Sequence, residues 1–251
     1  TDKGVFLWVL DLKKSEATKV SELKLNANIG SVINWFSDSK YMLVKVLPEN
    51  RSELINPKNV IPNGPKVSTN FGEKAQNRTY QDLLKNKTDE FNFELLATSE
   101  LYKISIQGKS EKWLDSNMYT NISISPDGKF VMINKIKKPF SYLVTYRRFP
   151  TSIDVYSIDS KHITNLVDIP LIEELPKGFM SVRKGKRSFR WRSDKASTLI
   201  YVVALDEGDP AKEVEFRDQI FELNAPFNNN GRSILKTINR FRGIDWGNKN
   251  I

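Results

Sequence analysis

One short unit, a β-strand followed by a tight turn and a second β-strand, recurs along this chain and restricts the folds that it can adopt. Its clearest copy runs from Asn121 to Ile136 (NISISPDGKFVMINKI), where Ile122 and Ile124 alternate with serines before the turn Pro126-Asp127-Gly128. Such alternation is typical of a half-buried strand, and Pro, Asp and Gly each favour a turn. Similar units begin at three other places, Val32–Val46, Ser188–Ala204 and Gly243–Asn248. The recurrence predicts a fold built from repeated antiparallel units.

A second unit, a β-hairpin, alternates with the first. Its copies surround polar or glycine-containing turns at Asp11–Glu16, Gln107–Lys109, Asp159–Lys161 and Asn228–Gly231. The two units together supply four antiparallel strands, which is what a blade of a β-propeller requires. We therefore expect an all-β fold, a partial β-propeller with about three full four-stranded antiparallel blades plus fractions. Residues 1–251 should form a single propeller segment, whose last strand would begin at Gly243.

The connections between these units differ in length, and the long ones should lie at one end of the propeller. They cover residues 48–98, 137–151, 168–186 and 206–217. Successive strands of a blade reverse direction, so these four connections emerge at the same end. Long loops on a rigid scaffold often carry binding sites, which makes this end the functional candidate. Within the insertion at about 48–98, the residue spacing predicts helices over Thr79–Asn86 and Glu90–Ala97.

The net charge and the cysteine content limit the kinds of ligand and of catalysis that this chain could support. The net charge of 39 − 30 = +9 could suit nucleic acid, an acidic membrane surface or an acidic substrate. The absence of cysteine excludes thiol catalysis, disulfides and thiolate metal sites in this chain. No apolar run approaches the roughly 20 residues of a membrane helix, so we predict no membrane partner. The segment RSFRWR interleaves aromatic and basic residues, but its alternation favours Phe189 and Trp191 as core, and we predict no nucleic-acid partner.

The residues that could carry catalysis or bind metal are few. The single histidine, His162, lies beside a hairpin turn with no G-x-S-x-G segment in the chain, which favours a structural role. The pair Glu173-Glu174 could hold a substrate ammonium group, although a solvated first turn of a short helix is the favoured interpretation. The acidic loop Asp206–Asp209 lacks the spacing of an EF-hand. We predict no catalytic residue, no metal and no cofactor in this chain.

Basic residues gather in two of the long connections. They are Arg147, Arg148, Arg183, Lys184, Lys186 and Arg187. A guanidinium group can bind a carboxylate through two parallel hydrogen bonds, so such a cluster is suited to an acidic side chain or a peptide terminus. A solvated rim with some docking contacts is the alternative interpretation.

Long stretches of the chain resemble the glutamyl endopeptidases, plant chloroplast enzymes with bacterial relatives in the prolyl oligopeptidase family. The stretches are Asn63–Gly108, Pro139–Asp159, Asp168–Thr198 and the residues near Phe216-Arg217-Asp218. The resemblance implies a peptidase whose amino-terminal β-propeller covers a carboxy-terminal α/β-hydrolase domain with serine, aspartate and histidine. It covers propeller sequence only, so the catalytic domain is absent here and no catalytic residue can be carried over.

The resemblance implies a non-catalytic propeller segment of a serine peptidase, which gates and helps to bind peptide substrates, with a preference for Glu. Arg148, Arg183 and Arg187 are then the predicted substrate-binding residues, and the partners are the peptide and the parent protein's α/β-hydrolase domain. The alternative is a stand-alone propeller that serves as a protein-interaction platform. A third hypothesis, nucleic-acid binding, predicts affinity that falls steeply with salt.

The ends of the sequence predict unpaired strand edges, as in a fragment of a longer protein. Exposed edges invite pairing with another chain, so self-association through the blade edges is expected. The family resemblance suggests a bacterial periplasmic or secreted setting.

Overall fold

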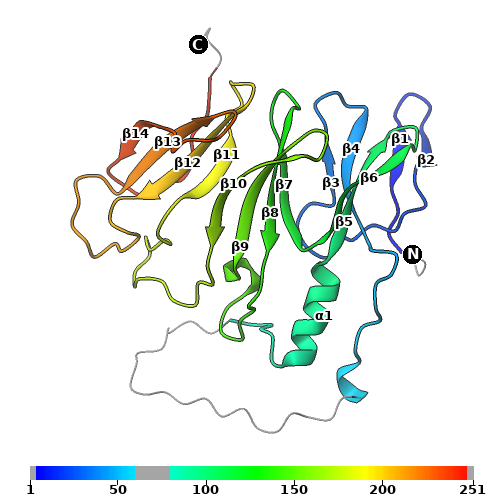
Figure 1. The fold of residues 1–251 in the computed structure, drawn as a ribbon, viewed down its shortest axis with the longest axis horizontal. Helices are drawn as coiled ribbons and strands as arrows, with labels where there is room; N and C mark the ends of the chain where they lie inside the picture. The colour runs from blue at the N-terminus through cyan, green and yellow to red at the C-terminus, as the bar shows by residue number, and fades with distance from the viewer. Residues whose placement is uncertain (1–3, 60–79, 248–251) are drawn as a thin grey trace.

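Four antiparallel β-sheets stand side by side in the computed structural model, which describes residues 4–59 and 80–247 (Figure 1). A two-stranded sheet contains β1 (Trp8–Asp11) and β2 (Glu16–Lys19). The first four-stranded sheet contains β3 (Ile33–Trp35), β4 (Tyr41–Val46), β5 (Ser99–Ser105) and β6 (Ser110–Asn117). The second contains β7 (Tyr119–Ile124), β8 (Phe130–Ile136), β9 (Thr151–Ser157) and β10 (His162–Ile169). The third contains β11 (Arg187–Trp191), β12 (Thr198–Ala204), β13 (Asp218–Asn224) and β14 (Arg232–Thr237).

The strands of each four-stranded sheet follow one another in chain order, and every neighbouring pair is antiparallel. This is the up-and-down arrangement of a propeller blade. The expectation of an all-β partial propeller, with three full blades and a fraction, is therefore confirmed over the described residues. No helix in these residues is long and apolar enough to cross a membrane.

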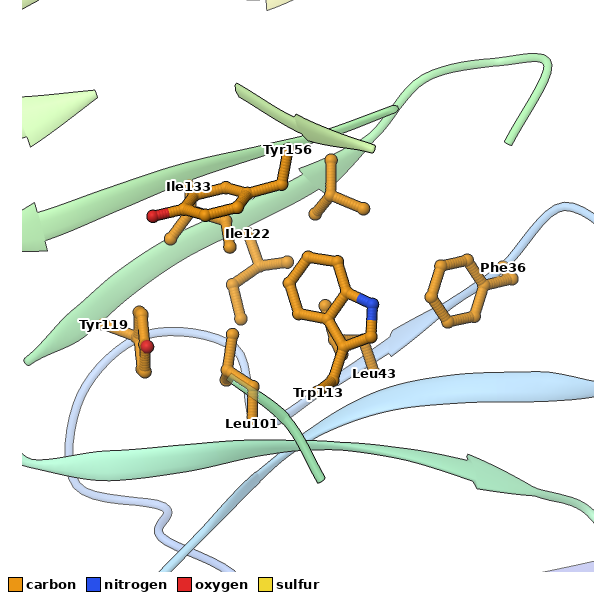
Figure 2. Packing of buried hydrophobic residues seen from close by; sticks show 9 residues of the cluster. Phe36, Leu43, Leu101, Trp113, Tyr119, Ile122, Ile133 and Tyr156 are labelled. Atoms are coloured by element: carbon orange, nitrogen blue, oxygen red, sulfur yellow. The ribbon is translucent and has the colours of Figure 1, made fainter. Parts of the chain in front are cut away.

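The hydrophobic core lies between neighbouring sheets. Figure 2 shows one such layer, in which Leu101 and Trp113 of the first four-stranded sheet face Ile122 and Tyr156 of the second. The Trp113 indole also donates a hydrogen bond of 2.8 Å to the Ile158 carbonyl, which joins the two sheets through a polar contact. Burying one large apolar side chain contributes about 1.5–3 kcal/mol, so these layers hold the blades in register.

Long connections gather at one end of the sheets, which we call the loop-bearing end. Their described parts span residues 47–59, 80–98, 137–150, 170–186 and 205–217. Figure 1 shows the helix α1 and the connections at 137–150 and 170–186 at the lower edge, opposite the short hairpin turns. Neighbouring connections touch: the Ile172 amide donates to the Arg148 carbonyl (3.0 Å), and the Val182 amide donates to the Gly208 carbonyl (3.1 Å). The loops therefore form a continuous surface.

The insertion contains one α-helix in its described part, α1 (Lys87–Ala97), and a short 3₁₀ turn, η1 (Pro57–Asn59). The predicted helix at Glu90–Ala97 is confirmed, and it starts three residues earlier. The predicted helix over Thr79–Asn86 is wrong from residue 80 onward, while Thr79 lies outside the described residues. The Asn86 side chain accepts a hydrogen bond from the Asp89 amide (2.9 Å) and caps α1, and Asp82 has φ +55°. The extended N-cap residue and the positive φ both lie outside the right-handed helical region, so neither residue is helical.

The predicted strand at Gly243–Asn248 is also wrong over its described residues, because residues 238–247 contain no strand. Asn248 lies outside the described range. Phe241 and Trp246 instead pack against Ile200 and Val202 on the third four-stranded sheet. The Arg192 guanidinium lies 3.5 Å from the centre of the Trp246 ring. Burying these aromatic side chains on an apolar sheet face stabilises the fold more than an isolated additional strand would.

Candidate functional site

A hollow of about 330 Å³ lies at the loop-bearing end of the second four-stranded sheet. We call it the first hollow. Its described lining comprises Ile29, Gly30, Thr120, Asn121, Asn134, Ile136, Tyr146, Arg147, Phe149, Thr151, Ile169, Ile172 and Arg183. Three connections (β2–β3, β8–β9 and β10–β11) and the four strands β7 to β10 thus contribute to the lining. The volume is at the lower limit of small-ligand sites.

A second hollow, of about 480 Å³, adjoins the first and shares Ile172 and Arg183 with it. Its described lining is Pro170, Leu171, Ile172, Glu173, Glu174, Leu175, Pro176, Val182, Arg183, Lys184 and Glu207. Arg183 therefore belongs to the wall between the two hollows. It lies in the β10–β11 connection, which folds back to the end of the second sheet.

Arg183 is half-buried and its hydrogen bonds go to its own loop. The guanidinium donates from Nη1 to the Lys184 carbonyl (3.0 Å) and from Nη2 to the Lys186 carbonyl. Burial lowers the pKa of Arg183 to about 10, and the positive charge of Arg187 adds to this effect. No ion pair joins Arg183 to a carboxylate of the residues in ranges 4–59 and 80–247.

Arg148 and Arg187, the other two predicted binding residues, lie outside the described linings of both hollows. Arg148 ends the 3₁₀ turn η2 (Tyr146–Arg148), and its guanidinium carbon is 5.4 Å from the centre of the Tyr80 ring. Arg187 is buried in β11 and forms an ion pair with Asp218. Arg147, which belongs to the same basic cluster, lines the first hollow together with Tyr146 of the same turn.

The floor of the first hollow is a tight seam between two blades. Gly30 has φ +65°, and a Cβ atom placed on it would lie 1.8 Å from the Thr120 carbonyl oxygen. Beneath the seam, the buried Lys45 ammonium donates to the carbonyls of Ile29 and Tyr119 (3.4 Å to the latter). Burial lowers the pKa of Lys45 to about 8. Two backbone carbonyls thus stabilise a cation that has no carboxylate partner among the described residues.

Helix α1 supports the wall of the first hollow from outside. Phe93 packs edge-on against Phe140 and Phe149, with ring centres 5.1 and 5.6 Å apart, and Phe149 lines the hollow. The Tyr142 hydroxyl donates to the Glu90 carboxylate, which raises the pKa of Tyr142 to about 12. The insertion therefore fixes the connection that carries Arg147.

The acidic residues of the second hollow are mostly engaged. The Glu173 carboxylate accepts a hydrogen bond of 2.6 Å from the Ser141 hydroxyl, whereas Glu174 is exposed. Hydrogen bonds from Lys212 and Lys184 lower the pKa of Glu207 to about 2. The helical interpretation of the Glu173-Glu174 segment is wrong, because residues 170–176 contain no helix. Proline at both ends of this segment favours extended backbone.

Two other predicted positions lie in structural contacts. His162 begins β10, and its Nε2 is 3.2 Å from the Asp154 carboxylate while its ring packs edge-on against Tyr156. Asp206 is fully buried and pairs with Arg217 (2.9 Å) and Arg240 (2.5 Å). The described residues contain no group of three or more acidic or histidine side chains positioned to hold a metal ion.

The blades and their short and long connections define a partial β-propeller. No family model matches the chain. The chain is 38% identical over 251 residues to a probable chloroplastic glutamyl endopeptidase of Oryza sativa subsp. japonica, covering 98% of this chain and 26% of the relative. A probable chloroplastic glutamyl endopeptidase of Arabidopsis thaliana is 34% identical over 96% of this chain and 25% of its own length.

The predicted resemblance to the glutamyl endopeptidases is therefore confirmed over nearly the whole chain. It spans about a quarter of the length of these curated relatives. Among solved structures, the tricorn protease matches with a TM-score of 0.43 at 12% identity, over 89% of this chain and 16% of that one. An uncharacterized protein of Listeria monocytogenes EGD-e matches with a TM-score of 0.40 at 7% identity, over 84% and 42%.

Proposed function

We propose that this chain is the non-catalytic propeller portion of a serine peptidase of the prolyl oligopeptidase family. Its loop-bearing end gates access to the active site and helps to bind peptide substrates. The observation that carries the proposal is the pair of adjacent hollows sharing Arg183 at that end. The relatives' names support the peptidase assignment. The bond-breaking residues would belong to an α/β-hydrolase domain, because this chain has no G-x-S-x-G segment and its one histidine lies outside the described linings of both hollows.

A preference for glutamate at the cleavage site would require cations near the bound peptide. Arg148, Arg183 and Arg187 remain our predicted substrate-binding residues, and replacing each with Ala in the complete enzyme is expected to raise KM for glutamyl peptides. Of the three, Arg183 should have the largest effect, about tenfold, because a charge-assisted hydrogen bond contributes about 1.5–3 kcal/mol. Steady-state kinetics with matched Glu and Gln peptides measure the effect.

The exposed Arg232→Ala, in β14, serves as the control for this kinetic series. Arg187→Ala also leaves buried Asp218 with fewer partners, so its melting temperature must be recorded beside its KM. Equal kinetics of the Arg183 variant and the parent on both Glu and Gln peptides would remove the glutamate preference from the proposal.

A second candidate function, a protein-interaction platform, is favoured by the two-stranded sheet. One edge of β1 is unpaired in the described residues, and the Trp8 and Leu10 side chains on this strand are 57% and 56% exposed. An apolar strand with a free edge can add strands from another chain.

Self-association through this edge is therefore expected for the chain on its own. Light scattering should show a mass above that of the monomer at micromolar concentration, and Leu10→Lys should reduce it, because an edge lysine opposes strand pairing. Leu143→Lys, at an exposed loop position, is the matched control and should leave the mass unchanged. A monodisperse monomer for the parent chain would exclude this contact.

A further inference from the structure

The first hollow has a cationic lining. Arg147 comes from η2 and Arg183 from the β10–β11 connection, and no Asp or Glu is present among the described residues that line this hollow. Lys45 adds a third positive charge beneath the floor, where it contacts the carbonyls of Ile29 and Tyr119. The local field in the hollow therefore favours an anion.

The two lining guanidinium groups differ from the buried arginines of the third four-stranded sheet. Arg187, Arg192 and Arg240 each form an ion pair with a carboxylate of the same sheet or its flanking loops. Arg147 and Arg183 form none with a carboxylate in the described ranges. Arg183 is half-buried and therefore loses hydration that its neighbours do not fully replace, whereas Arg147 is exposed. An incoming carboxylate could pair with both guanidinium groups.

The remaining lining suits a small organic acid group. Five apolar side chains form walls that exclude water and strengthen charge–charge attraction: Ile29, Ile136, Phe149, Ile169 and Ile172. Asn134 also lines the hollow, and its buried Oδ1 has no hydrogen-bond partner in the described part of the chain. A ligand with an N–H group near its carboxylate could satisfy this acceptor, and a peptide has that combination.

We propose that Arg147 and Arg183 together form a carboxylate-binding site in the first hollow, which takes one acidic group of a peptide. The group is either a Glu or Asp side chain or a terminal carboxylate, because both present the same two oxygens. Arg147 thereby joins Arg183, one of the three predicted substrate-binding residues, in this site. The inference rests on the proposed function only in treating the ligand as a peptide.

Calorimetric titration of the complete protein with three small probes tests this site. N-acetyl-glutamate N-methylamide carries a side-chain carboxylate, N-acetyl-alanine carries a terminal carboxylate, and N-acetyl-glutamine N-methylamide is the neutral isostere of the first. At least one carboxylate probe should bind tighter than the neutral one by about tenfold or more. Arg147→Met should remove most of this difference and leave the affinity for the neutral probe within about twofold.

Arg147→Met is the main variant because Arg147 is exposed and holds no described ion pair, so the fold should tolerate the change. Arg183→Lys keeps the charge but loses the planar pair of donors, and it should also weaken the carboxylate probe several-fold. Arg232→Met, which removes an exposed guanidinium outside the hollow, is the matched control and should bind all probes as the parent does.

The three probes separate the possible outcomes. If Arg147→Met weakens the binding of the glutamate probe alone, the site takes an acidic side chain. If it weakens the binding of N-acetyl-alanine alone, the site takes a terminal carboxylate. Equal affinity of the parent for all three probes, or unchanged carboxylate affinity in Arg147→Met, overturns the site. Peptide hydrolysis by the complete protein is measured separately, so a failed carboxylate site leaves the proposed peptidase function standing, and the converse also holds.

Discussion

Gly30→Ala is expected to reduce the free energy of unfolding by about 3–5 kcal/mol. The added Cβ would lie 1.8 Å from the Thr120 carbonyl oxygen, which belongs to the backbone of the neighbouring blade and cannot move aside alone. The φ of +65° adds strain for any L-residue other than glycine. Because Gly30 also lines the first hollow, the variant should bind the carboxylate probes more weakly.

Urea denaturation of the parent chain and the variant measures the first effect. Gly243→Ala is the matched control, because no atom lies within 4 Å of a Cβ built on Gly243 and its φ is outside the positive range. We expect that control to change the free energy of unfolding by no more than about 0.5 kcal/mol. A loss below about 1 kcal/mol in Gly30→Ala would show that the blades are not packed at this seam.

Asp206→Ala is expected to cost about 3–5 kcal/mol, because it removes one partner from a buried ionic network. Arg240 is 4% exposed by side chain and donates to Asp206 (2.5 Å) and Asp218 (2.8 Å), while Arg217 donates to Asp206 (2.9 Å). The same network anchors the β10–β11 connection, since the Arg240 Nε donates to the Met180 carbonyl (3.0 Å). Thermal unfolding should show a melting temperature lower by roughly 10 °C.

The network also gives this prediction a pH dependence. Burial by itself would raise the pKa of Asp206, but hydrogen bonds from Arg240, the Gly208 amide and Arg217 hold it below the ordinary value. A carboxylate with a lowered folded-state pKa stabilises the protein above the unfolded pKa of about 3.9, and this contribution disappears as the pH falls through the folded-state pKa. The difference in stability between the parent and Asp206→Ala should therefore shrink below about pH 4.

Glu22→Gln is the control for the ionic network. Glu22 pairs with Lys19 at 2.6 Å, but its side chain is 86% exposed, so solvent screens the pair. Its loss should cost no more than about 1 kcal/mol. Equal effects of Glu22→Gln and Asp206→Ala would mean that the buried network does not hold the last blade together.

Strand-scale features of this protein were predictable because they depend on neighbouring residues. The turn Pro126-Asp127-Gly128 and its flanking alternation predicted β7 and β8, and the order of similar units predicted the meander of each sheet. The two errors had different causes. Asn86 is the extended N-cap that starts α1, so the helical pattern of residues 80–86 forms no helix, and Trp246 packs on the face of a sheet distant in sequence instead of entering a strand.

The candidate site shows the limit of local reasoning more clearly. The sequence placed the basic residues in two long connections, and strand alternation was enough to put those connections at one end of the propeller. Only the tertiary structure decided which cations line the first hollow: Arg147 and Arg183 do, whereas Arg187 is held by Asp218 and Arg148 lies near Tyr80. Periodicity and turn chemistry act over a few residues, so the sequence determined the strands and their order. The partner of each charged side chain depends on which distant segments meet, and that is decided when the blades pack.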